Sequence, residues 1–129
     1  MKKVLFVCVG NAGRSQMAEA FFNTMAKGRA QAFSAGTNPA SAIDQTVVGL
    51  MKEVGIDISD KHPKKLTLEM LEQADRVVTM GCGVAQSCPA TLTETEDWEL
   101  EDPKGQPPEK VREIRDEIRR RVEKLLKGW

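Results

Sequence analysis

The sequence predicts an α/β fold in which a four-stranded parallel sheet carries helices on both faces. Short apolar runs rich in β-branched residues alternate along the chain with longer segments whose apolar residues recur at helical spacing. The chain has 129 residues, so we treat residues 1–129 as a single domain. Apolar residues make up 40% of the chain and charged residues 29%, a composition typical of a folded protein rather than a disordered one.

The first half of the chain predicts a strand, a helix, a strand and a helix in turn. Residues 4–7 form a continuous apolar run, which suits a strand buried on both faces. Residues 15–27 show helical spacing, and Gly28 follows where left-handed helix caps are common. Residues 31–34 predict a second short strand. Residues 43–54 again show helical spacing, and a glycine ends that helix.

The second half predicts a short helix, two strands and a closing helix. The short helix runs through residues 70–71, and the strands cover residues 76–80 and 97–101. In residues 109–124, twelve of the sixteen side chains are charged and the apolar ones form one stripe, as in an amphipathic surface helix. We expect two ion pairs at a spacing of four residues to support it, Asp116 with Arg120 and Glu117 with Arg121.

The charges of the chain balance, since nineteen Lys and Arg residues face nineteen Asp and Glu residues. This balance disfavours nucleic acid and anionic membranes as partners, although a local patch can still bind a small anion. The longest apolar run, residues 4–9, is too short for a membrane span or a signal peptide. We therefore expect a cytoplasmic protein and a monomer, with no membrane and no nucleic acid among its partners.

Three cysteines, Cys8, Cys82 and Cys88, are the unusual feature of the composition. An odd number cannot all pair with one another, so a secreted disulfide scaffold is disfavoured. The chain has no C-x2-C motif and only one histidine, His62, so we expect no metal and no other cofactor. Each thiol is then a buried side chain, a nucleophile or a member of a redox relay.

The motif C-x5-R-S joins the first predicted strand to the first predicted helix, over Cys8–Ser15. Glycines let its N–H groups turn inward around an anion, the helix adds its positive end, and Arg14 supplies a fork for two oxygens of a tetrahedral oxyanion. The same field favours the thiolate form of Cys8 and makes it a candidate nucleophile, the alternative being a small buried residue that ends a strand. Ser15 is the N-cap of the helix, a hydrogen-bond partner of the thiolate, or both. The candidate oxyanion-binding residues are Val9, Gly10, Asn11, Ala12, Gly13, Arg14 and Ser15.

The other two cysteines follow the predicted strand over residues 76–80. In a parallel sheet this places Cys82 at the same edge as Cys8. If the segment between Cys82 and Cys88 were helical, their Cα atoms would lie roughly 10 Å apart, beyond the ~7 Å limit for a disulfide. A Cys82–Cys88 disulfide therefore requires this segment to unwind, and two unrelated buried thiols are the alternative.

Residues 4–19, VLFVCVGNAGRSQMAE, resemble the phosphate-binding loop and first helix of the low-molecular-weight protein tyrosine phosphatase fold. Within that superfamily the chain resembles the thioredoxin-coupled arsenate reductases nearly from end to end. The resemblance implies a low-molecular-weight phosphatase-like fold, and arsenate or phosphate as the small oxyanion that the protein binds. Further matching segments are FSAG at 33–36, GIDIS at 55–59, VVTMGC at 77–82 and DP at 102–103.

The resemblance also implies a reaction sequence. Cys8 would attack arsenic, Cys82 would attack Cys8 and release arsenite, and Cys88 would attack Cys82. Thioredoxin or an equivalent dithiol would then reduce the Cys82–Cys88 disulfide. Asp102 would be the general acid that protonates the departing oxygen, whereas without the resemblance Asp102 and its proline are an ordinary turn pair.

Two further readings of the same residues stay open. A phosphatase would need only Cys8, Arg14 and Asp102, and an oxyanion-binding or thiol-sensing module would catalyse nothing. Phosphotyrosine is a poor expected substrate, because the phosphatases of this fold place aromatic residues after the acid. Here Lys104 and Gly105 follow it, and the chain contains no tyrosine.

One departure concerns a potassium site that some members of the reductase family carry. Three residues match the side chains that hold the ion there, namely Asn11, Glu19 and Ser34, but Lys65 stands where an aspartate is expected. An ammonium group at this position would replace the ion and contact Asn11 and Glu19, the alternative being a solvated lysine cluster. We therefore predict turnover that is insensitive to potassium.

Overall fold

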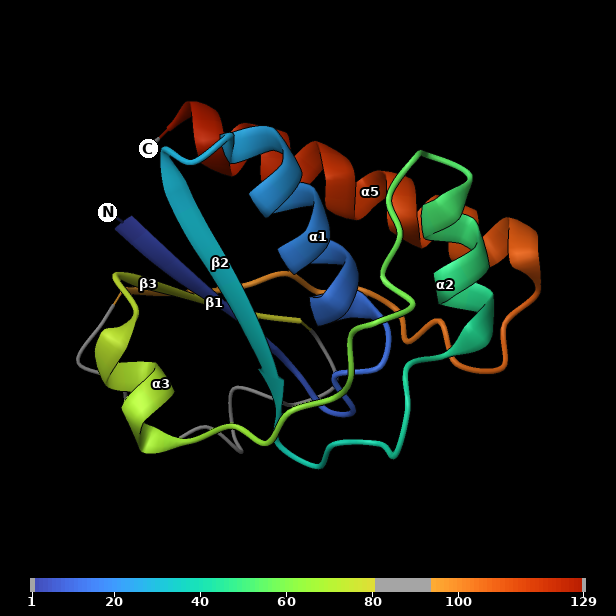
Figure 1. Cartoon of the computed structure of the whole chain (residues 1–129), viewed down its shortest axis with the longest axis horizontal. Helices are drawn as coiled ribbons and strands as arrows, with labels where there is room; N and C mark the ends of the chain where they lie inside the picture. The colour runs from blue at the N-terminus through green and yellow to red at the C-terminus, as the bar shows by residue number, and fades with distance from the viewer. Residues whose placement is uncertain (1, 81–93, 129) are drawn as a thin grey trace.

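A computed structural model of the chain describes residues 2–80 and 94–128. Its centre is a four-stranded sheet in the order β2-β1-β3-β4, and each neighbouring pair of strands is parallel. The first strand of the chain therefore lies inside the sheet, between the second and the third (Figure 1). This confirms the predicted parallel sheet. The strands are β1 (Lys2–Cys8), β2 (Ala30–Gly36), β3 (Arg76–Thr79) and β4 (Glu94–Asp97).

Helices cover both faces of this sheet, as predicted. On one face α1 packs against β2 and against α5, and α2 packs against α5. On the other face α3 contacts β1, and Figure 1 shows it apart from the other helices. The observed bounds differ from the predicted ones by a few residues. The helices are α1 (Arg14–Ala26), α2 (Gln45–Lys52), α3 (Leu68–Gln73) and α5 (Pro108–Lys127).

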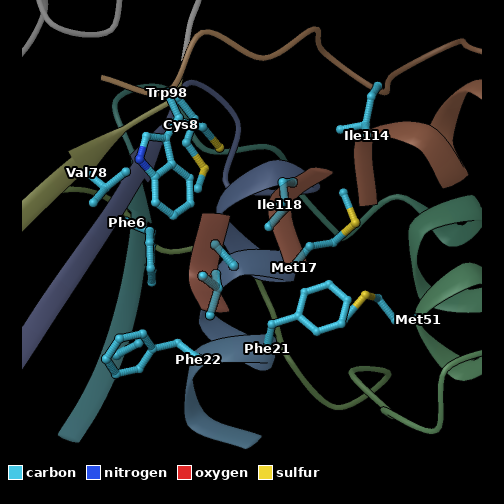
Figure 2. Packing of buried hydrophobic residues seen from close by; sticks show 14 of the residues in the cluster. Phe6, Cys8, Met17, Phe21, Phe22, Met51, Val78, Trp98, Ile114 and Ile118 are labelled. Atoms are coloured by element: carbon cyan, nitrogen blue, oxygen red, sulfur yellow. The ribbon is translucent and has the colours of Figure 1, made fainter. Parts of the chain in front are cut away.

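The middle of β1 is buried on both faces, which explains its uninterrupted apolar sequence. Phe6 points towards α1, and its ring lies between those of Trp98 and Phe22 (Figure 2), at centroid distances of 5.6 and 6.1 Å. Leu5 and Val7 point to the opposite face, where they join a smaller cluster under α3. Replacing a buried aromatic ring such as Phe6 with alanine costs about 3–5 kcal/mol, so this packing anchors the strand that carries the site.

The ends of the helices follow local sequence signals. Lys27 and Gly28 both adopt positive φ angles, of 50° and 84°, so the left-handed cap predicted after the first helix is confirmed. Asp44 caps α2, because its carboxylate accepts a hydrogen bond from the N–H of Thr46 at 2.9 Å. The cap at Asp44 also fixes where the segment between β2 and α2 ends, and this segment borders the site described below.

The last strand lies earlier in the chain than predicted. We expected it over residues 97–101, but β4 covers Glu94–Asp97. Its sequence, ETED, is polar and forms the edge of the sheet, so no apolar pattern marks it. Trp98, which follows the strand, is buried and its N–H donates to the carbonyl of Thr79, after which residues 98–101 leave the sheet.

Several ion pairs lie on the surface of α5, and one of the two that we predicted has a different partner. Glu117 contacts Arg121, as expected. Arg120 contacts Glu117, three residues before it, and not Asp116, which contacts its neighbour Arg115. Glu117 thus binds two arginines and takes the partner that we assigned to Asp116. Within residues 2–80 and 94–128, no helix is long and apolar enough to cross a membrane.

Candidate active site

The loop between β1 and α1 is held by main-chain hydrogen bonds from the segment that follows β2. Four amides of residues 37–44 donate to carbonyl oxygens of the loop at 2.9–3.1 Å. The carbonyl of Asn11 accepts from Nε2 of Gln16 at 3.2 Å. Five consecutive carbonyls, of residues 8–12, thus have partners outside the loop. The four main-chain bonds run from Thr37 to Cys8, from Asn38 to Val9, from Ala40 to Gly10 and from Asp44 to Ala12.

These outward carbonyls turn the N–H groups of the loop inward. In a trans peptide the C=O of one residue and the N–H of the next point in opposite directions, and the described residues contain no cis peptide. The amides of residues 9–13 are therefore directed into the loop, where the N–H of Asn11 donates to the sulfur of Cys8 at 3.2 Å. Inward amides at the start of a helix form an anion-binding nest, which we call the oxyanion cradle (residues 8–15).

Cys8 lies at the bottom of this cradle and is 2% exposed. The hydroxyl oxygen of Ser15 lies 2.9 Å from its sulfur. Nδ2 of Asn11 donates to the same hydroxyl oxygen at 2.7 Å, so the Ser15 hydroxyl joins Asn11 to the sulfur. The predicted contact between Ser15 and Cys8 is confirmed.

The other predicted role of Ser15 is wrong. α1 begins at Arg14, so Ser15 lies inside the helix and its hydroxyl does not cap it. The N-cap is Gly13, which has no side chain, so no side-chain cap competes for the N–H groups of the first helical turn.

Arg14 is buried beside the cradle, with 3% of its side chain exposed. Its Nη1 donates to the carbonyl of Met80, after β3, at 2.7 Å and to the carbonyl of Leu100 at 3.1 Å. Its Nη2 lies 3.9 Å from a carboxylate oxygen of Asp102. Contacts to three residues, from the end of β3 and the loop after β4, fix the plane of the guanidinium group, which is what a fork for two oxyanion oxygens requires.

Asp102 lies at the mouth of the site and is half exposed. Its second carboxylate oxygen accepts the N–H of Lys104 at 3.0 Å, which holds the side chain in a local turn. The preceding residue, Glu101, is tied to Lys110 at the start of α5 by an ion pair of 3.0 Å. The hydrogen bond that Lys110 donates to Glu101, together with the negative charge of Glu101, raises the pKa of Lys110. The exposed carboxylate of Asp102 lies beside Arg14 and lines the same pocket as Cys8.

These elements enclose a pocket of about 440 Å³. Its walls are the cradle, the segment between β2 and α2, and the loop after β4. Among the described residues that line the pocket there is no aromatic side chain, so nothing in this wall stacks on a phenol ring. The lining residues are Cys8, Val9, Gly10, Ala12, Gly13, Arg14, Asn38, Pro39, Ala40, Ala42, Asp44, Asp102, Pro103 and Lys104.

Asn11 stands behind the cradle and joins it to three other segments. It adopts a positive φ of 50° and is fully buried. Its Nδ2 also donates to the hydroxyl of Ser34 at 3.0 Å, and its Oδ1 accepts from Gln16 and from the N–H of Lys64. Ser34 in turn donates to the carboxylate of Glu19 at 2.9 Å. The three residues that we matched to a cation site therefore form one hydrogen-bonded row.

The ammonium group beside this row belongs to Lys64 and not to Lys65. Nζ of Lys64 lies 3.9 Å from the carboxylate of Glu19. Nζ of Lys65 donates instead to the carbonyl of Thr37 at 3.3 Å. Adjacent residues of an extended segment point to opposite sides, so matching the cation site to Lys65 missed the correct side chain by one residue. Asn11 is contacted by the main-chain N–H of Lys64 and not by its ammonium group, so the predicted ammonium contact is found at Glu19 alone.

Cys82 and Cys88 lie outside the described residues.

Two structural elements of the site were not predicted from the sequence. Gln16 is 1% exposed and its Nε2 donates to Asn11 and to the carbonyl of His62, but a glutamine inside a helix is no signal of such a role. The amides of residues 37–44 act through the main chain, which sequence does not report. A hint was Gly36: a Cβ there would lie 2.6 Å from the carbonyl oxygen of Val9, so only glycine allows this approach.

Comparisons with known proteins agree with this arrangement. Residues 3–128 match the family model described as low molecular weight phosphotyrosine protein phosphatase. A glutaredoxin arsenate reductase of Synechocystis sp. is 41% identical over 129 residues, which cover 98% of this chain and 97% of that protein. The structure of a Corynebacterium glutamicum thioredoxin-dependent arsenate reductase superposes with a TM-score of 0.85 at 41% identity. It matches 99% of this chain, which spans only 61% of that protein. A low molecular weight protein tyrosine phosphatase from T. tengcongensis superposes with a TM-score of 0.89 at 31% identity, with both chains covered completely.

Proposed function

The chain belongs to the low molecular weight phosphotyrosine protein phosphatase family, and we propose that within this family it is an arsenate reductase. The observation that carries the proposal is the buried sulfur of Cys8, which faces the inward amides of the cradle, accepts a hydrogen bond from the N–H of Asn11 and shares one with the hydroxyl of Ser15. A thiolate below a tetrahedral oxyanion site is arranged for attack on the central atom of the bound anion. The names of the relatives select arsenic as that atom.

In the first proposed step the Cys8 thiolate attacks arsenate. A sulfur–arsenic bond forms, and one arsenic–oxygen bond breaks as Asp102 gives its proton to the departing oxygen, which leaves as water. Arsenic stays pentavalent at this stage. Arg14 and the amides of residues 9–13 neutralise the charge on the remaining oxygens.

The second and third steps move electrons through the other two cysteines. The Cys82 thiolate attacks the sulfur of Cys8, a disulfide forms, and the electron pair of the sulfur–arsenic bond stays on arsenic, which leaves as trivalent arsenite. The Cys88 thiolate then attacks Cys82, which frees Cys8 and leaves a Cys82–Cys88 disulfide. A dithiol reductant such as thioredoxin supplies the two electrons that reduce this disulfide and is itself oxidised.

The test measures arsenite formation by the purified protein with thioredoxin, its reductase and NADPH. Wild type should turn over repeatedly. Cys88→Ser should release about one arsenite per chain and then stop at a Cys8–Cys82 disulfide, because only the last transfer is blocked. Cys82→Ser should release none. Repeated turnover by Cys88→Ser would contradict the relay, and wild type that forms no arsenite with any dithiol would contradict the proposal itself.

The electron donor is tested by the same assay. The relatives include one protein named for glutaredoxin and one described as thioredoxin-dependent. We propose thioredoxin, and a parallel reaction with glutathione and glutaredoxin decides between the two. Support of turnover by glutaredoxin alone would overturn this choice while leaving arsenate reduction in place.

A phosphatase is the second candidate, and the placement of Cys8, Arg14 and Asp102 around one pocket favours it. Its action would need neither Cys82 nor Cys88. Hydrolysis of p-nitrophenyl phosphate should therefore survive in the Cys82→Ser and Cys88→Ser variants and disappear in Cys8→Ser. If esters are hydrolysed and no arsenite forms, the phosphatase replaces the reductase as the function of this site.

A further inference from the structure

Gly13, in the cradle, packs against Pro103 in the loop that carries Asp102. A Cβ atom built on Gly13 would lie 2.8 Å from Cγ of Pro103 and 3.7 Å from its Cδ. Real Cβ atoms do not approach another carbon this closely, since carbon atoms make their best contact at about 3.5–4.0 Å. Pro103 is buried although Asp102 and Lys104 on either side are exposed. Its ring therefore occupies the space that a side chain at position 13 would need.

The proline ring cannot turn aside as a flexible side chain would, because it is closed onto its own main chain. That main chain is fixed on both sides of Pro103. The carbonyl of Leu100 accepts from Arg14, and the carbonyl of Pro103 accepts from the N–H of Gln106 at 3.1 Å. Glu101 is tied to Lys110. A push on Pro103 is thus transmitted along the main chain to Asp102, the residue bonded to it.

We propose that Gly13 and Pro103 form a size-matched contact that sets the position of Asp102 over the oxyanion cradle. Pro103 is then a positioning residue, and the absence of a side chain at Gly13 is what admits it. The inference rests on the proposed role of Asp102 as proton donor. It explains why a half-exposed carboxylate on a surface loop holds a defined place 3.9 Å from a buried arginine.

The functional test uses Gly13→Ala and two aryl phosphates that differ in how much they need an acid. Phenyl phosphate loses a poor leaving group and depends on a positioned proton donor, whereas 2,4-dinitrophenyl phosphate loses a stable phenolate and does not. Gly13→Ala should lower kcat/KM for phenyl phosphate about tenfold or more, within the roughly 10²–10⁴-fold that a positioned acid contributes. The loss of kcat/KM for the dinitrophenyl ester, which reports on the cradle without the acid, should be several-fold smaller. Asp102→Asn should show the same pattern more strongly.

The double variant Gly13→Ala/Pro103→Ala tests the contact itself. Alanine at position 103 removes both ring atoms near Gly13 and should return part of the phenyl phosphate activity that Gly13→Ala alone loses. Gly49→Ala is the matched control, because a Cβ there meets nothing within 4 Å. Equal loss on both esters, or no recovery in the double variant, would show damage to the cradle rather than displacement of Asp102 and would overturn the proposal. No loss in Gly13→Ala would overturn it as well.

A urea unfolding cycle on wild type, Gly13→Ala, Pro103→Ala and the double variant does not depend on any activity. Gly13→Ala should lower the urea midpoint. Pro103→Ala should lower the midpoint by less in the Gly13→Ala background than in wild type, because there it also relieves the crowding. Additive midpoint shifts would deny the contact. If wild type neither forms arsenite nor hydrolyses esters, the proposed function fails, and this cycle alone still decides whether Gly13 and Pro103 are coupled.

Discussion

The hydroxyl oxygen of Ser15 lies 2.9 Å from the sulfur of Cys8, seven residues earlier in the chain. A loop and the first turn of a helix bring the two together, and Asn11 orients the hydroxyl from behind. The sulfur thus accepts a main-chain N–H and contacts a hydroxyl group in a buried setting. Hydrogen bonds to a charged group are stronger than those between neutral groups.

Ser15→Ala should lower the reactivity of Cys8. Loss of a hydrogen bond to a charged group, worth about 1.5–3 kcal/mol, should slow alkylation of Cys8 by iodoacetamide near pH 7 by about tenfold or more. The rate is followed by mass spectrometry of the peptide that contains Cys8. Ser59→Ala, at an exposed position, is the matched control and should react like wild type. An unchanged rate in Ser15→Ala would deny the contact any role in activating the thiol.

Arg14→Lys should weaken oxyanion binding and catalysis together. A lysine keeps the charge but cannot bond two carbonyls and still present a planar fork to an anion. We expect kcat/KM for arsenate to fall by about 10²–10³, the usual cost of losing one oriented donor at a charged transition state. Titration calorimetry with inorganic phosphate should show weaker binding. Arg29→Lys, an exposed arginine outside the pocket, should behave as wild type, and comparable activity of Arg14→Lys would contradict the assigned role.

Wild-type turnover should be the same in potassium and in sodium. The ammonium group of Lys64 lies beside Glu19 at the end of the row formed with Ser34, where it supplies a positive charge. Lys64→Met removes this charge and should make turnover respond to potassium, whereas Lys65→Met should not, because Lys65 contacts only a carbonyl oxygen in this part of the chain. Initial rates at equal ionic strength test both statements. A rise of several-fold for wild type in potassium would overturn the first.

The stability of the fold should fall in acid in a way that depends on Glu53. The hydrogen bond from Arg112, followed by that from Arg115, lowers the pKa of Glu53 from 4.5 to about 2. A carboxyl whose pKa is lower in the folded state stabilises the fold above pH 4.5, and this contribution is lost as the pH falls towards 2. Urea midpoints of Glu53→Gln should therefore change less over this interval than those of wild type. Glu72→Gln, an exposed change on α3, should keep the wild-type pH dependence.

Most of the fold follows from apolar patterning. The buried β1, the amphipathic α5 and the cap after α1 carry strong local signals, and each forms within a few residues of the prediction. The bounds of β4 were predicted too late in the chain, because a short polar edge strand needs no apolar residues of its own. Its pairing with β3 fixes where it lies, and such pairing is a non-local property.

The sequence predicted the reactive groups of the site but not the contacts that hold them in place. A cysteine, two glycines and an arginine at fixed spacing indicate an oxyanion loop wherever a strand precedes them and a helix follows. The contact between Gly13 and Pro103 joins residues ninety positions apart, so spacing along the chain says nothing of it. The choice between Lys64 and Lys65 depended on which way one side chain of an extended segment turns. A shift of one residue reverses that direction.

Residues 37–44 hold the oxyanion cradle through main-chain amides, so this support does not depend on the identity of their side chains. Asn38, Pro39, Ala40 and Ala42 nevertheless form one wall of the pocket. Reshaping that wall can therefore admit a larger or differently charged guest while the hold on its anionic head stays as it is. Laboratory evolution towards other oxyanions has its natural starting positions there.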